Sequence, residues 1–86
     1  MTEDAQLILE AVLEIVRLRV PDLKEIRLEQ EFVLDLGLGS LDLAELSATI
    51  ETKLKLSVFD DVAINGFLTV GELVEFCEKA RRASRS

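Results

Sequence analysis

Ser40 is the residue whose surroundings first raise a question of chemistry. It follows the glycine-containing loop end "LDLGLG" and precedes the leucine-rich stretch "LDLAEL". A serine hydroxyl attacks an electrophile efficiently only when a nearby base takes its proton. The chain contains no histidine, and no lysine is clearly placed to act as that base. We therefore expect no catalytic residue, and a hydrolase or transferase with Ser40 as nucleophile is disfavoured.

The simplest role for Ser40 is structural. A serine at the N-terminus of a helix can accept a hydrogen bond from a free backbone amide. Asp42 fits the same interpretation, because a carboxylate in the first turn interacts favourably with the helix dipole. Gly37 and Gly39 would supply the loop geometry before the helix. Considered alone, these residues predict that Ser40 caps a helix.

Few other side chains could do chemistry. Cys77 is the single cysteine, which excludes an internal disulfide. Its place on an apolar helix face predicts a buried thiol without a chemical role. Asp60 and Asp61 are adjacent acids typical of a solvated helix start. The sequence has no zinc, EF-hand or phosphate-loop spacing, so we expect no metal site.

The 86-residue chain has a formal net charge of −7. Nucleic-acid binding depends on clustered Lys and Arg, so this charge argues against it and favours protein partners with basic surfaces. Charged residues interrupt every apolar run before the roughly 20 residues that a membrane span needs. The first residues show no signal-peptide pattern. We expect a cytoplasmic, monomeric domain without membrane insertion.

The first half of the sequence predicts a helix followed by a long loop. Residues 2–19 place acids in the first turn and arginines in the last, and Pro21 should end the helix near residue 19 or 20. Residues 21–39 keep neither helix nor strand period and are predicted to be a loop. The apolar face of the first helix is expected at Leu7, Ala11, Ile15 and Leu18.

Three further helices are expected. The second covers residues 40–54, a brief third one covers 60–64 and closes at Asn65 and Gly66, and the last begins at a capping box formed by Thr69 and Glu72. No stretch alternates like a half-buried strand. We therefore predict an all-α, small four-helix bundle over residues 1–80, followed by a short, basic, disordered tail over 81–86. The buried stripe of the second helix is expected at Leu43, Leu46, Ile50 and Leu54.

One face of the second helix does not fit a purely structural role. At about 100° per residue, Leu41 points away from the buried stripe and faces solvent. The positions that continue from it carry Glu45, Ala48 and Thr52, with Asp42 alongside. An exposed strip that combines one large apolar residue, small residues and acids is suited to docking a protein partner.

The stretch around Ser40 resembles the attachment-site motif of acyl carrier proteins. Residues 35–46, "DLGLGSLDLAEL", are similar to that family's aspartate-leucine-glycine followed by aspartate-serine-leucine. Residues 69–76, "TVGELVEF", are similar to the threonine-valine-glycine start of the family's last helix. The resemblance implies that a phosphopantetheinyl transferase attaches 4′-phosphopantetheine from coenzyme A to Ser40. The prosthetic thiol would then carry acyl groups as thioesters.

The same resemblance implies roles for other residues. Partner enzymes that transfer, condense or modify acyl groups in fatty-acid or polyketide biosynthesis would approach with basic docking surfaces. The partner-binding surface would consist of Asp35, Leu41, Asp42 and Glu45, extended by Ala48 and Thr52 of the exposed strip. In this family acyl chains enter the space between the second and third helices. Here that space would be lined by Leu46, Ile50, Phe59, Val62 and Ile64.

Departures from the family pattern leave alternatives open. Gly39 stands where the family commonly has aspartate, which removes one acidic contact to a transferase and keeps an unmodified, carrier-like interaction subunit as an alternative. Glycine before the serine also occurs in peptidyl carriers, so an aminoacyl or peptidyl carrier of a nonribosomal pathway is another. After Glu45 the second helix has Lys53 and Lys55 against a single acid, Glu51, which favours a dedicated partner set such as a polyketide pathway.

Overall fold

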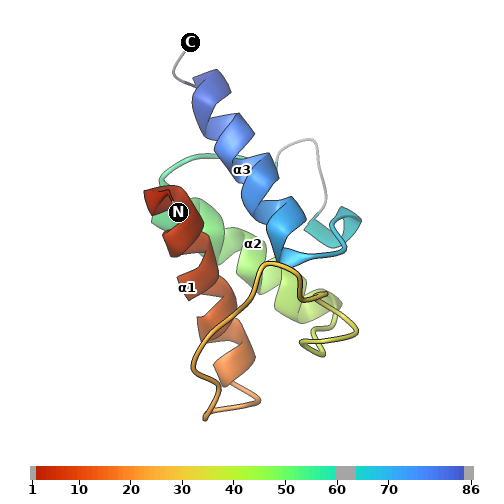
Figure 1. Ribbon diagram of the computed structural model, residues 1–86. Coiled ribbons are helices and arrows are strands. Elements are labelled where there is room, and N and C mark those ends of the chain that lie inside the picture. The colour runs from red at the N-terminus through yellow and green to blue at the C-terminus, as the bar shows by residue number, and fades with distance from the viewer. Residues whose placement is uncertain (1, 60–63, 85–86) are drawn as a thin grey trace.

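The computed structural model describes residues 2–59 and 64–84. Its elements in chain order are α1 (Glu3–Arg17), α2 (Ser40–Leu54), a 3-10 helix η1 (Ile64–Gly66) and α3 (Val70–Ser84). α1 packs against both α2 and α3, and η1 packs against α2 (Figure 1). The described residues contain no β-strand, which confirms the predicted all-α class. None of the described helices is long and apolar enough to cross a bilayer.

The short helix predicted as the third is not found as an α-helix in the described part of the chain. Most of the expected range 60–64 lies outside it, and Ile64 instead begins the single turn of η1. Asn65 and Gly66 complete that turn, where glycine and asparagine favour a turn over continued α-helix. The described chain therefore has three α-helices and one short 3-10 helix.

α1 is shorter than predicted at both ends. Thr2 is its N-cap, and the Thr2 hydroxyl accepts a hydrogen bond from the Ala5 amide at 3.1 Å. Leu18 was expected on the buried face, but the helix ends at Arg17 and the Leu18 side chain is 70% exposed. Leu18 is the C-cap residue and keeps helical dihedral angles, with φ −64° and ψ −25°, but it lies beyond the last helical residue, so this part of the prediction is wrong. Leu7 is only partly buried against the core. The observed buried face consists of Ala5, Ile8, Ala11, Val12, Ile15 and Val16.

α2 has the predicted bounds and the predicted buried stripe, Leu43, Leu46, Ile50 and Leu54. It ends at Leu54, and its C-cap residue Lys55 adopts the left-handed conformation with φ 54°. The Lys55 amide donates to the Glu51 carbonyl and closes the last turn. This cap is usually a glycine, because a Cβ is disfavoured at positive φ.

The loop between α1 and α2 is held against the start of α3 (Figure 1). The Phe32 amide donates to the Leu68 carbonyl at 3.1 Å, and the Gly71 amide donates to the Leu28 carbonyl at 2.8 Å. A Cβ on Gly71 would lie only 3.1 Å from that Leu28 oxygen, so glycine permits the close approach. Four loop side chains are buried in the core and also hold the loop against the helices: Ile26, Phe32, Leu36 and Leu38.

α3 begins close to the predicted capping box but ends later than predicted. The Thr69 hydroxyl accepts from the Glu72 amide at 3.2 Å, while the Glu72 carboxylate accepts from the Leu68 amide at 3.0 Å. The helix then runs to Ser84, so residues 81–84 are not the expected disordered tail. Arg81 fixes this last turn by pairing with Asp4 of α1, a contact that local sequence patterns do not reveal.

Candidate functional site

Ser40 is the first residue of α2, and its side chain is exposed. The predicted capping role is wrong, because the N-cap is Gly39. Gly39 is extended, with φ −98° and ψ −178°, and Ser40 already belongs to the first helical turn. Among the described residues the Ser40 hydroxyl has no hydrogen-bond partner. The structure therefore leaves this hydroxyl available at the end of a rigid element.

The cap of α2 comes from Asp42 instead. Its Oδ2 atom accepts a hydrogen bond from the Gly39 amide at 2.9 Å, which satisfies a donor just before the helix. The same oxygen lies 2.6 Å from Nη2 of Arg19, and the Asp42 side chain is only 15% exposed. Asp42 lies beside Ser40 as expected, but its carboxylate already has two partners within the chain.

A tight turn at Gly37 lies just before Ser40. Gly37 has φ +66°, and its amide donates to the Val33 carbonyl at 3.1 Å. The Asp35 carboxylate accepts from the Glu31 amide at 2.7 Å and closes the preceding turn. Because Leu38 is buried, the segment leading to Ser40 is anchored in the core. Asp35 is exposed, so the structure gives it a local structural role as well as a place near the serine.

The predicted docking strip lies on the surface of α2. Leu41 is the most exposed large apolar residue of the described chain, at 86%. Glu45, Ala48 and Thr52 are exposed as well. Within the part of the chain that the structure describes, the Glu45 carboxylate has no ion-pair or hydrogen-bond partner. The helical spacing in the sequence therefore identified this surface.

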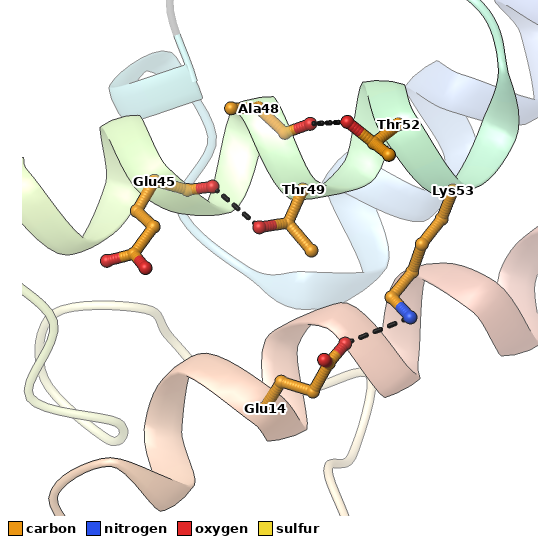
Figure 2. Close-up of a pocket in the computed structure, with 6 residues that line it drawn as sticks. All are labelled: Glu14, Glu45, Ala48, Thr49, Thr52 and Lys53. Carbon is orange, nitrogen blue, oxygen red and sulfur yellow. Dashed lines mark hydrogen bonds and ion pairs between the residues drawn. The ribbon is translucent and has the colours of Figure 1, made fainter.

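Part of this strip lines a shallow groove between α1 and α2, with a volume of about 370 Å³ (Figure 2). Thr49 and Thr52 turn their hydroxyls back to the helix, donating to the carbonyls of Glu45 and Ala48 at 2.9 and 3.0 Å. The lining residues are Glu14, Glu45, Ala48, Thr49, Thr52 and Lys53. The small side chains of α2 keep the groove open.

Glu14, the residue that α1 contributes to this groove, was not predicted from the sequence. Glu14 lies opposite α2, and its Oε2 atom pairs with Lys53 Nζ at 3.0 Å across the two helices (Figure 2). The only signal in the sequence was opposite charge on two predicted helices, which does not specify contact. Lys53 is therefore neutralised inside the groove and does not act as an isolated cation on α2.

The five residues expected to line an acyl cavity are placed as follows. Leu46, Ile50 and Ile64 are buried together in the core, and Phe59 packs against it. Val62 lies outside the described residues. The ring centroid of Phe59 is 6.2 Å from that of Phe76, and Phe67 lies 5.0 Å from the same ring. The four expected cavity residues that the structure describes therefore fill space within the core or at its edge.

Cys77 is buried in α3, as its position in the sequence predicted. Burial is the main cause that raises the pKa of its thiol to about 12, and the negative charges of Asp4, Glu51 and Glu78 add to the shift. Since the thiolate is the reactive form, the geometry gives Cys77 no chemical role.

The chain is similar to known proteins over most of its length. The phosphopantetheine attachment site family model matches residues 6–77. An acyl carrier protein of Clostridium perfringens is 44% identical over 52 residues, covering 60% of this chain and 67% of that protein. One from Helicobacter acinonychis is 37% identical over 62 residues, covering 72% and 78%. Together with the all-helical fold, these matches show that the chain belongs to the acyl carrier protein family.

Proposed function

We propose that this chain is an acyl carrier whose 4′-phosphopantetheine is attached at Ser40 and which presents acyl intermediates to fatty-acid or polyketide-type biosynthetic enzymes. Members of its family carry this group covalently, and its terminal thiol holds acyl groups as thioesters. The observation that carries the proposal is the exposed hydroxyl of Ser40 at the start of α2, which has no hydrogen-bond partner among the described residues. The chain itself is proposed to be a carrier and not an enzyme.

The residues around Ser40 fit a phosphodiester. The first amides of an α-helix have no intrahelical acceptor, and the helix dipole favours an anion at that end. The side chain is exposed, so a long flexible group could extend into solvent without displacing the core. Leu36 and Leu38 are buried on the approach and hold the attachment point in place.

The proposed docking surface is Leu41 together with the groove between α1 and α2. Leu41 offers an apolar contact one residue after the attachment point, and one turn further along Glu45 offers a carboxylate that no described residue pairs with. Exposed acids speed the approach of basic partners but add little affinity each, so docking should be fast, brief and weakened by salt. Asp35, Ala48 and Thr52 complete the proposed surface, and Asp42 lies within it with its carboxylate already paired to Arg19.

Cargo would be accommodated in the core beside α2. Leu46, Ile50 and Ile64 are buried, and Phe59 lies at the edge of the same core. An acyl chain would therefore need to displace side chains, because protein cores are closely packed. The small contact between α2 and η1 is the place where such a displacement would occur. We propose no membrane insertion, no nucleic-acid binding and a monomeric, cytoplasmic chain.

Intact mass spectrometry tests the attachment. The chain would be incubated with coenzyme A and a broad-specificity phosphopantetheinyl transferase, in parallel with Ser40→Ala and Ser57→Ala. Ser57 is also exposed but lies after α2, so it controls for nonspecific modification. We expect one phosphopantetheine on the wild type and on Ser57→Ala, and none on Ser40→Ala.

A different result would favour the other interpretations. No mass gain with several transferases would indicate an unmodified interaction subunit, with Gly39 as the residue that lacks a carboxylate for the transferase. If the chain does gain the phosphopantetheine, the modified form would next be offered acyl and aminoacyl donors by loading enzymes of each class. Loading by an aminoacyl-activating enzyme alone would favour the peptidyl carrier interpretation.

A further inference from the structure

Arg19 connects the end of α1 to both sides of the attachment residue. Its Nη1 atom donates to the Gly37 carbonyl at 3.1 Å, and its Nη2 atom pairs with Asp42 Oδ2 at 2.6 Å. Gly37 lies three residues before Ser40 and Asp42 lies two residues after it. One guanidinium therefore bridges the loop and the helix that together present the serine.

This bridge changes the charge that the surface presents. Asp42 Oδ2 is shared between Arg19 and the Gly39 amide, and the carboxylate is 15% exposed, whereas the Arg19 side chain is 58% exposed. A basic partner approaching Ser40 from this side meets a guanidinium before it meets the carboxylate. With glycine at position 39, no acid replaces the one that is covered. Glu45 is then the nearest acid on α2 that has no partner in the described part of the chain.

We infer that Arg19 is a specificity-determining residue, which masks Asp42 and disfavours partners that use a basic side chain to contact the acid beside Ser40. The inference rests on the proposed function of Ser40. Masking selects partners because like charges placed opposite each other at an interface are unfavourable. Partners that contact Leu41 and Glu45 would be unaffected, since neither side chain is paired with Arg19. The chain would thus favour an apolar contact at Leu41 with the basic contact displaced along α2.

The contact by which Arg19 masks Asp42 can be removed without disturbing the core. Arg19 is exposed, and exposed ion pairs contribute little to stability, so Arg19→Ala should fold. Arg17→Ala is the matched control, because it removes the same charge from the last turn of α1. Arg17 donates to the Pro21 carbonyl and has no contact with Asp42 in the described structure. Asp42→Asn removes the charge while keeping an oxygen that can accept from the Gly39 amide.

The experiment measures KM and kcat for modification of the apo chain by a transferase with a basic docking surface, at low and high salt. Arg19→Ala should lower KM about twofold to fivefold and leave kcat unchanged, because this factor corresponds to the free energy of an exposed ion pair. Arg17→Ala should change KM less. In the Asp42→Asn background, Arg19→Ala should have no larger effect than Arg17→Ala. High salt should reduce the difference between the two arginine variants.

Equal effects of the two arginine variants would overturn the inference, because net charge alone would then explain them. A fall in kcat, or an undiminished Arg19→Ala effect in the Asp42→Asn background, would overturn it as well. If the wild type is not modified at all, the proposed function of Ser40 fails separately. Titration calorimetry of the same variants with the transferase would still test the mask, because the order of Kd values should match the expected order of KM.

Discussion

The guanidinium of Arg81 lies 2.6 Å from the carbonyl oxygen of Leu54, so the last turn of α3 closes the C-terminal end of α2. The same side chain pairs with Asp4 at 3.0 Å, near the N-terminus of α1. Both charged side chains are largely buried, with exposed fractions of 25% and 18%. One arginine thus links the ends of all three helices at the C-terminal end of α2.

Replacing Arg81 with alanine should lower the free energy of unfolding by about 1–2 kcal/mol, because it removes hydrogen bonds between charged or carbonyl groups in a partly buried site. Urea denaturation would measure the change. Lys79→Ala is the matched control, since its pair with Glu75 is two-thirds exposed or more on both sides and should matter little. Equal losses in the two variants would contradict this role for Arg81.

Gly37→Ala should destabilise the fold by about 1 kcal/mol, because alanine is strained at the observed φ of +66°. The space around this position is open, so conformation and not collision is the cause. Gly66→Ala is the control: its surroundings are equally open, and it has no positive φ. Thermal unfolding of both variants measures the difference, and a loss at Gly66 as large as that at Gly37 would refute the explanation.

Lys55→Gly should stabilise the chain by about 0.5–1 kcal/mol, because glycine adopts the left-handed cap of α2 without the penalty that a Cβ brings. Lys55→Ala separates this effect from loss of the lysine charge, since alanine keeps the Cβ. We expect the alanine variant to resemble the wild type in denaturant melts. Stabilisation by alanine as well as by glycine would point to the charge.

The Cys77 thiol should resist alkylating and disulfide reagents in the native state near neutral pH, because its pKa is raised to about 12 and the side chain is buried. In denaturant it should react quickly. The raised pKa also makes the free energy of unfolding depend on pH. The unfolded chain loses the thiol proton near the ordinary value of 9.0, so the stability that the protonated Cys77 contributes is fully present below that pH and is lost as pH rises toward 12. Rapid native labelling would contradict the buried position.

Leu41→Ala should weaken productive encounter with partner enzymes while leaving stability unchanged, because the side chain is 86% exposed and lies beside Ser40. We expect a higher KM for the transferase, measured together with a thermal melt. Leu68→Ala provides a control at an exposed leucine of another segment, where 58% of the side chain is accessible. An equal rise in KM for both variants would remove the special role of Leu41.

Local patterns accounted for much of the site. The spacing of Leu43, Leu46, Ile50 and Leu54 identified the buried side of α2, and therefore also the exposed side that carries Leu41. The residues around Ser40 indicated the family that the comparisons then showed. These features could be inferred because helical periodicity and attachment motifs depend on residues close together in the sequence.

Other predictions failed where a boundary depended on backbone geometry. Ser40 was expected to cap α2, but the extended Gly39 is the cap residue and Asp42 supplies the acceptor. Leu18 was expected to be buried, but the chain turns after Arg17. Helix ends are decided by competition among nearby capping groups and shift by one or two residues, which the spacing of apolar residues does not resolve.

The sequence by itself determined the three main helices, the loop before α2 and the position of the candidate serine. Only the tertiary structure decided which charges meet: Arg19 with Asp42, Glu14 with Lys53, and Arg81 with Asp4. Long charged side chains have many rotamers and several possible partners, and their choice depends on how the helices pack. The periodicity of a helix fixes the direction of each residue, but only packing places two helices close enough for those residues to pair.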